Sequence, residues 1–354
     1  MSGTLIIYNG ARFNIMSITR NQRGPLIGAA QTAAFLAKVT SFNSSTNYVA
    51  PPATTSVTYL VVAGGGSGGH IGGGGGAGGF RSSVSGAASG GGASAEPALT
   101  VTAGSTIPVV VGAGGPTDGG NGTWRPGANS SFGPIVSLAG GGGGDRFAYT
   151  RPSSPAGGSQ LGQDGGSGGG SGIWYSVGNK PDGSAAGAGT ANQGFPGGGA
   201  RVPTSNYGCA VGGGGAGEAG QKGNPNNITG GRGGAGVSSS ITGSAVVYAD
   251  GGGGASGDST LSSPNDQGGA PGPGGSGGIG YGGSGGSSLI ATAAAVNRGG
   301  GGGGAAYGPA ATPRIVGAGG SGFVAVNDPN GSLIASSVWD IRAVFEKQKE
   351  GNWY

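Results

Sequence analysis

Short runs of aliphatic residues that lead directly into runs of glycine form the main pattern of this sequence. The first is Tyr59–Ala63 (YLVVA), which is followed at once by the glycine-rich stretch Gly64–Gly69. Apolar runs of this length, bounded by turn-forming residues, predict short buried strands. Similar runs occur at residues 107–111, 135–139, 209–211, 245–248 and 321–326. The recurrence predicts one glycine-punctuated domain over residues 59–326.

Glycine also recurs at every third position in parts of this domain. The positions are 214, 217, 220 and 223, then 269, 272, 275 and 278, and finally 274, 277, 280, 283 and 286. Three residues per turn is the repeat of the polyproline II helix, whose N–H and C=O groups make no internal hydrogen bonds and can bond to neighbours. Collagen shares this repeat but needs it without interruption, and here the register slips. We therefore predict a mainly β fold with an irregular glycine-rich scaffold, in which short strands join packed polyglycine or polyproline II helices.

The two ends of the chain have a more ordinary composition. In residues 1–58, the runs 5–8 (LIIY) and 12–15 (RFNI) flank Asn9-Gly10, which predicts a hairpin. Residues 29–39 are rich in helix formers. In residues 327–354, a capping-box-like start at Ser337–Asp340 predicts a short C-terminal helix.

Composition limits what kind of core this chain can build. It has 95 Gly and 20 Pro in 354 residues, a share that without a strict period is typical of low-complexity or disordered chains. Here the aliphatic runs are regularly placed, and only 34% of residues are hydrophobic. Because glycine lacks a Cβ and lets backbones approach closely, we expect backbone hydrogen bonds to replace much of the usual side-chain burial.

Charge and rare residues exclude several functions. The net charge is +4, but charged residues are only 8% of the chain and form no basic cluster, so we expect no nucleic-acid partner. The single cysteine, Cys209, excludes an internal disulfide, and the single histidine, His70, excludes most histidine-based metal sites. No apolar run of about eighteen residues and no signal peptide are present, so we expect no membrane span and folding in the cytoplasm.

The motifs that could indicate catalysis or cofactor binding are weak. Residues 64–69 satisfy the dinucleotide pattern G-x-G-x-x-G, but glycine continues to Gly79, where a helix is required. A glycosidase or lyase needs a rigid carboxylate pair, and the nearest grouping, Asp250, Asp258 and Asp266, lies in turn-like sequence where Asp bonds to local backbone. We therefore expect no enzyme activity, no cofactor and no metal.

Aromatic residues between the glycine runs are the best candidates for a contact surface. If the glycine segments run back and forth, the intervening segments lie at turns, and large rigid aromatic side chains in turns favour binding. The alternative is that each aromatic residue fills a gap beside the scaffold. The candidate residues are Phe147, Tyr149, Trp174, Tyr175 and Tyr207.

Several of these stretches resemble one family. The segments Tyr59–Gly66, Ile107–Gly115, Asn129–Gly133, Leu138–Gly144 and Gly320–Val326 are similar to the glycine-rich domain of bacteriophage tail-fibre and adhesin proteins, and residues 338–353 are similar to the ends of many phage tail proteins. The resemblance implies a virion tail protein made in the host cytoplasm. It also implies contact with a host surface polysaccharide or outer-membrane protein through loops between packed glycine segments.

The resemblance leaves two functions open. One is an adhesin whose aromatic loops, with Trp174 and Tyr175 foremost, touch the host receptor. The other is a purely structural virion component, such as a decoration or tail-assembly protein, whose loops contact other virion proteins. By elimination, residues 1–58 are the expected virion-attachment region. Because phage fibres are commonly threefold, the resemblance also predicts a homotrimer.

Overall fold

The structure is a computed structural model of the whole chain. It describes residues 3–9, 12–18, 35–70, 72–117, 125–145, 161–172, 186–199, 209–223, 229–255, 291–305 and 315–333. The chain divides into two compact units, one formed by Phe35–Ser332 and the other by Met1–Ala34 with Leu333–Tyr354. Residues 35–58, which the composition groups with the N-terminal region, thus belong to the same unit as the glycine runs.

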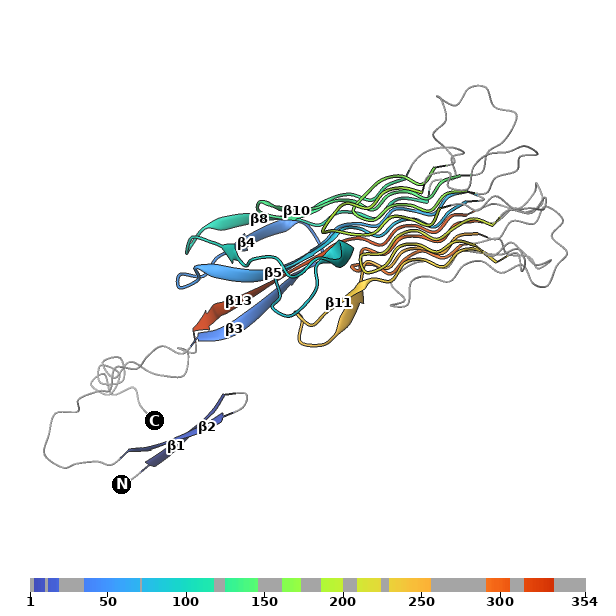
Figure 1. Ribbon diagram of the computed structural model, residues 1–354. Helices are drawn as coiled ribbons and strands as arrows, with labels where there is room; N and C mark the ends of the chain where they lie inside the picture. Colours follow the sequence, from blue (N-terminus) through green and yellow to red (C-terminus); the bar gives the residue numbers. More distant parts are fainter. Residues whose placement is uncertain are drawn as a thin grey trace, which may run out of the picture. The chain divides into compact units, whose positions relative to one another are not determined.

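The described secondary structure is mainly β, as predicted, with one short 3-10 turn, η1 (Gly90–Gly92). Figure 1 shows the strands together at one end of the larger unit and the glycine segments running away from them. The strands are β1 (Gly3–Asn9), β2 (Arg12–Ile18), β3 (Phe35–Phe42), β4 (Thr46–Val49), β5 (Ser56–Val62), β6 (Phe80–Ser82), β7 (Leu99–Thr100), β8 (Thr106–Val110), β9 (Ser130–Phe132), β10 (Ile135–Ser137), β11 (Val237–Ser239), β12 (Val246–Tyr248) and β13 (Phe323–Leu333).

Two sheets and a hairpin make the strand-rich part of the larger unit. One sheet has the order β3-β13-β5-β6, with β7 also paired to β5, and the other has the order β10-β9-β8-β4. The central strands β5 and β13 pair antiparallel, with Val62 opposite Phe323 and Tyr59 opposite Val326. Successive residues of a strand point to opposite faces, and both faces of β5 and β13 are covered. This is why their sequences are continuous apolar runs instead of alternating ones.

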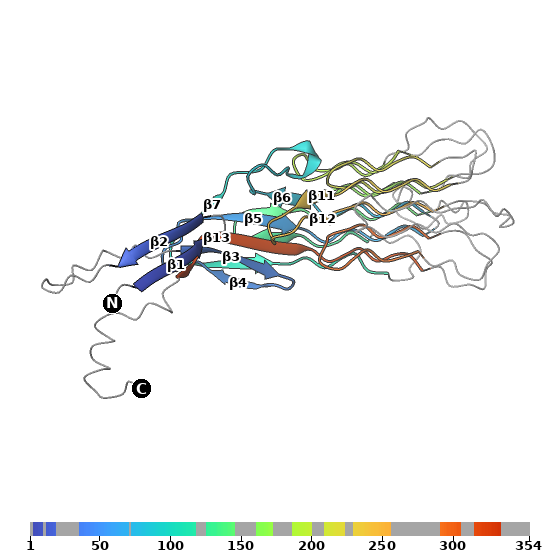
Figure 2. The ribbon, with the colours of Figure 1, turned by 90° about the horizontal axis from the view of Figure 1, so that it is seen from below.

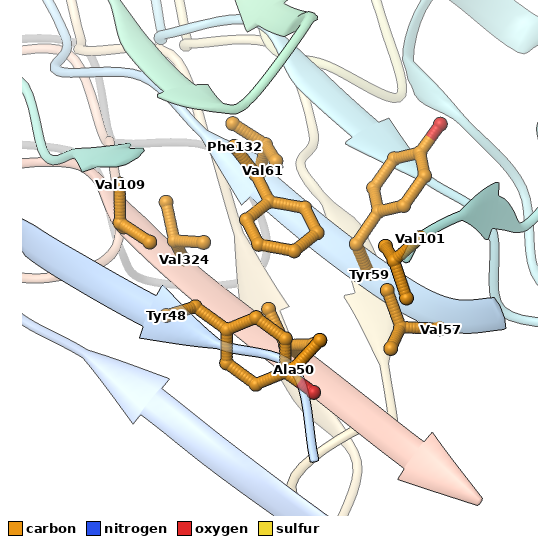
Figure 3. Close-up of a cluster of buried hydrophobic side chains, with 10 residues drawn as sticks. Tyr48, Ala50, Val57, Tyr59, Val61, Val101, Val109, Phe132 and Val324 are labelled. Atoms are coloured by element: carbon orange, nitrogen blue, oxygen red, sulfur yellow. The ribbon is translucent and has the colours of Figure 1, made fainter. Parts of the chain in front are cut away.

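The first hydrophobic cluster lies between the two sheets (Figure 3). Phe132 is fully buried at its centre, with its ring 5.7 Å from that of Tyr48 and 6.4 Å from that of Tyr59. The Tyr48 hydroxyl donates a hydrogen bond to the buried carboxylate of Asp328, at 3.1 Å. The Thr54 hydroxyl donates to the same oxygen at 2.6 Å. These bonds fix the end of β13 to the opposite sheet. Burial, followed by the charge of Asp328, raises the pKa of Tyr48.

The second hydrophobic cluster covers the other face of β5 and β13. Leu60, Val62 and Phe323 contribute to it, together with Tyr248 from the β11–β12 hairpin. The rings of Tyr248 and Phe323 stack with centroids 5.3 Å apart. The hairpin therefore forms a third layer over the sheet.

Beyond the strands, the glycine segments pack side by side into a bundle (Figures 1 and 2). In the segment 64–69 each N–H donates to a carbonyl of another segment, and every third residue donates to the same one. The donor–acceptor pairs are Gly64–Ala128 and Ser67–Arg125, Gly65–Gly320 and Gly68–Gly317, and Gly66–Gly76 and Gly69–Gly73. Three donor directions that repeat every three residues are the geometry of a threefold extended helix.

The segment 72–79 lies at the centre of six neighbouring segments. Its N–H groups donate to carbonyls of segments 138–144, 211–214 and 299–305, and its carbonyls accept from segments 63–69, 167–170 and 252–255. These bonds are between 2.8 and 3.2 Å long. The backbone groups of a buried segment are therefore satisfied without side chains, as burial requires. This is the backbone replacement for a side-chain core that the composition predicts.

Glycine is required in this bundle because a side chain would not fit. A Cβ placed on Gly74, Gly75 or Gly213 would lie closer than 3.0 Å to a backbone oxygen of a neighbouring segment. None of these three residues has a positive φ. Close approach, and not left-handed conformation, thus explains glycine at these positions.

Three local predictions need correction, and two lie outside the described residues. Residues 35–39, expected to be helical, form the first part of β3, because pairing with β13 overrides helix propensity. Residues 209–211 belong to a bundle segment instead of a strand. The glycines at 214, 217, 220 and 223 do not mark one helix, since the chain reverses: Gly212 donates to Gln221 and Gly215 to Glu218. The C-terminal helix and the repeats at 269–286 lie outside the described residues.

The predicted N-terminal hairpin is confirmed. Strands β1 and β2 pair antiparallel in a register that runs from Gly3 opposite Ile18 to Asn9 opposite Arg12.

Candidate binding end of the glycine bundle

The bundle segments end together at the pole that lies away from the sheets. The Ala255 N–H donates to the Gly72 carbonyl, and the Ala305 N–H donates to the Gly69 carbonyl, both at 3.0 Å. The Ala210 N–H donates to the Ala255 carbonyl, also at 3.0 Å. Residues that are far apart in the sequence are thereby held side by side. This set of segment ends, formed by residues 69, 70, 72, 144–145, 171–172, 209–211, 255 and 305, is called the binding end below.

The five predicted contact residues all lie outside the described residues, but three described residues lie close to them in the sequence. Asp145 precedes Phe147 by two positions, Gly172 precedes Trp174 by two, and Cys209 follows Tyr207 by two. The structure brings these neighbours together. The Val211 N–H donates to the Ser171 carbonyl at 3.4 Å, and a Cβ on Gly172 would lie closer than 3.0 Å to the Asp145 carbonyl oxygen. The segments that lead to all five residues therefore meet at the binding end.

Asp145 is a residue of this end whose role the sequence analysis did not identify. It is 7% exposed, and its carboxylate accepts a hydrogen bond from the backbone N–H of His70 at 2.5 Å. His70 in turn forms an isolated parallel bridge with Ala305. One carboxylate thus ties the turn after segment 64–69 to the end of segment 138–145. The available signal was an acidic residue placed directly after a glycine run.

We expect Asp145→Ala to loosen the binding end, because it leaves the partly buried N–H of His70 without this acceptor. The amide of His70 should exchange with solvent at least about tenfold faster. Amide hydrogen exchange of the full chain measures this. Asp145→Asn, which keeps an acceptor oxygen, should have a smaller effect. Asp164→Ala is the matched control, since the exposed Asp164 accepts from the Ala188 N–H at 2.6 Å in a different part of the bundle. If the His70 amide exchanges at the parent rate in Asp145→Ala, Asp145 does not hold the binding end together.

A second cluster of polar side chains lies beside the sheets. Glu96 accepts hydrogen bonds from the Arg81 guanidinium at 2.8 and 2.7 Å and from the Tyr59 hydroxyl at 2.8 Å. Burial, then the hydrogen bond to Glu96, raises the pKa of Tyr59, and the hydrogen bond to Glu96 raises the pKa of Arg81. Tyr59 therefore stays protonated, and Arg81 stays charged. The cluster fixes the segment around Glu96 to β5 and β6, and its role is therefore structural.

The carboxylates considered for sugar cleavage are only partly described. Asp250 is fully buried and accepts a hydrogen bond at 2.6 Å from the N–H of Gly236, which lies 14 positions earlier in the chain. Asp258 and Asp266 lie outside the described residues. Within the described ranges, no group of three or more His, Cys, Asp or Glu residues could hold a metal ion. In the same ranges, the structure has no helix that is long and apolar enough to cross a membrane.

A comparison with known protein families agrees with this geometry. The sequence profile of the glycine-rich domain family matches residues 40–327. The chain belongs to this glycine-rich domain family. The matched range begins in β3 and ends in β13, so the glycine-rich domain includes both sheets as well as the bundle. A search of curated proteins gave no match to the chain.

Proposed function

We propose that this protein is a phage tail-fibre or adhesin subunit that binds a host surface polysaccharide or outer-membrane protein through the loops at the binding end. The observation that supports this is that the segment ends that form the binding end meet at one pole. Such an arrangement displays several loops on one rigid base, which is the general plan of loop-based binding sites.

The direction in which the strands of the larger unit run also supports the proposal. Strand β3 begins, and β13 ends, at the pole away from the bundle (Figures 1 and 2). The segments 1–34 and 333–354 are therefore joined to the pole opposite the binding end. The eight residues of segment 72–79 alone would span roughly 25 Å at roughly 3.1 Å per residue. The proposal therefore assigns receptor contact to the pole of the larger unit that lies opposite these two chain connections.

Replacing Trp174 and Tyr175 together with alanine tests the proposal. We expect adsorption of the purified full-length protein to host cells to fall at least about tenfold, because aromatic anchors dominate contact surfaces. The melting temperature should stay within about 2 °C of the parent value, since the proposal assigns these residues to a contact surface, where substitutions change stability little. Trp339→Ala, which removes an aromatic residue outside the larger unit, is the control and should adsorb like the parent.

Two results would count against the proposal. A parent protein that never adsorbs to cells, yet is present in virus particles, would favour the purely structural virion component. A double variant that melts far below the parent, while its folded fraction adsorbs normally, would assign Trp174 and Tyr175 to internal packing. Release of oligosaccharide from host polysaccharide would instead indicate a depolymerase.

A further inference from the structure

Segment 138–144 differs from the central segment of the bundle in the partners of its N–H groups. Each N–H of the central segment 72–79 donates to a backbone carbonyl of a neighbouring segment. In segment 138–144, two of the three donor directions also meet backbone carbonyls. The donor–acceptor pairs are Gly140–Gly64 and Gly143–Ser67 in one direction, and Gly141–Ser167 and Gly144–Gly170 in the other.

In the third direction, two side chains take the place of a neighbouring segment. The Ala139 N–H donates to Asn129 Oδ1 at 2.7 Å, and the Gly142 N–H donates to Gln163 Oε1 at 3.3 Å. Asn129 is exposed and Ala139 is half-buried, so this row of N–H groups, called the third row below, runs along an edge of the bundle. The two amide oxygens supply the acceptors that a further segment would supply with its carbonyls.

Without these side chains, the third row would be able to accept a glycine segment. The N–H groups of one row are three residues apart, roughly 9 Å at roughly 3.1 Å per residue, and the carbonyls along any threefold glycine segment repeat at the same spacing. Polyglycine has no side chain that would distinguish a segment of the same copy from one of another. Unpaired backbone groups at a sheet edge invite pairing with another chain in the same way. A second copy of this chain, which carries many such segments, therefore fits the third row.

Segment 291–296 also lies at the surface of the bundle, and it also carries side chains there. The N–H groups of Ala291 and Ala294 donate to the carbonyls of Ile315 and Ala318, and both alanines are buried. The other residues of this segment are exposed, and Val296 is 73% exposed. In the interior, a Cβ on a glycine such as Gly75 would lie closer than 3.0 Å to a neighbouring backbone. Side chains on outward positions therefore prevent the close approach that a further glycine segment needs.

We propose that Asn129 and Gln163 close the third row against a glycine segment of a second copy and so keep two bundles from joining side to side. Their amide oxygens satisfy the N–H groups of Ala139 and Gly142, and their side chains occupy the place of the added segment. The proposal concerns the side of the bundle and is independent of what its loops bind.

The double variant Asn129→Gly, Gln163→Gly of the full-length chain tests the proposal. In dilute solution the amides of Ala139 and Gly142 should exchange with solvent at least about tenfold faster than in the parent, because both lose their acceptors. In concentrated solution the variant should form at least about ten times more side-to-side dimer and larger species than the parent. The same two amides should then become protected again, because the second copy covers them. Sedimentation velocity and amide hydrogen exchange at both concentrations measure these effects.

Two further double variants serve as controls. Asn129→Asp with Gln163→Glu keeps an acceptor oxygen at both positions, so the amides of Ala139 and Gly142 should stay protected as in the parent. Asn192→Gly with Gln221→Gly removes the same two kinds of side chain from exposed positions, where neither accepts a backbone N–H from the described residues. This pair should keep the oligomeric state of the parent.

Three results would contradict the proposal. The first is a folded glycine variant whose two amides exchange at the parent rate, which would show that Asn129 and Gln163 do not close the row. The second is a variant with both amides open that keeps the oligomeric state of the parent. The third is association that leaves both amides open, which would place the contact between copies elsewhere. If the double variant does not fold, Asn129→Gly alone opens the row at Ala139, and the same results decide, with an expected increase in association of about threefold.

Discussion

Replacing Gly75 with alanine should lower the free energy of unfolding by at least about 3 kcal/mol, more than an ordinary overpacking change. The new Cβ would lie closer than 3.0 Å to the carbonyl oxygen of Gly66. Segment 64–69 would have to move away, which stretches the hydrogen bond from the Gly66 N–H to the Gly76 carbonyl, now 2.9 Å. Because segment 72–79 bonds to six neighbours, the displacement cannot be absorbed at a free surface. Urea unfolding followed by circular dichroism measures the change.

Gly199→Ala is the matched control for this prediction. Gly199 also lies in a bundle segment, but a Cβ there would have no heavy atom within 4 Å. Its substitution should change stability by no more than about 1 kcal/mol in either direction. If Gly75→Ala and Gly199→Ala unfold alike, the glycines of segment 72–79 are spacers, and the bundle derives its stability from elsewhere.

Replacing Phe132 with alanine should cost about 3 to 5 kcal/mol, the range for removing a buried aromatic side chain. Phe132 is fully buried between the rings of Tyr48 and Tyr59, and the two sheets meet on it. The bundle should unfold in the same transition as the sheets, because β5 continues directly into segment 63–69 and segment 315–322 continues directly into β13.

Two comparisons make the Phe132 prediction specific. Phe132→Leu keeps most of the apolar volume and should cost clearly less, about 1.5 kcal/mol. Val136→Ala removes a side chain that is 39% exposed on the neighbouring strand β10 and should cost less than about 1 kcal/mol. A Phe132→Ala protein in which the sheet signals melt early, while glycine amides such as Gly75 stay protected, would show that the bundle is stable by itself.

The candidate site could be predicted from sequence only in part. The aromatic segments were expected at turns between glycine segments, and Asp145, Gly172 and Cys209, which lie next to them in the sequence, do meet at one pole. The role of Asp145 was missed. Its acceptor bond to the His70 N–H joins residues 75 positions apart, and no local pattern indicates such a pair.

What the sequence determined by itself is the set of local structures. The apolar runs at Tyr59–Val62 and Phe323–Val326 specify buried strands, and Asn9-Gly10 between two apolar runs specifies a hairpin. The glycine content, with too few apolar residues for an ordinary core, specifies close backbone packing. These features depend on side-chain volume, polarity and φ preference, which each residue carries with it.

Only the tertiary structure decided which segments are neighbours. Polyglycine carries no side chain that could distinguish one partner segment from another, and its hydrogen bonds join residues far apart in the sequence, such as Gly65 and Gly320. For the same reason the reversal at Gly217 and Glu218 was invisible in a glycine repeat that continues through it. The β-strand from Phe35 was likewise decided by pairing with β13, against the helix propensity of its own residues. Where side chains differ, the sequence specifies the structure, and where they are absent, the network of backbone hydrogen bonds does.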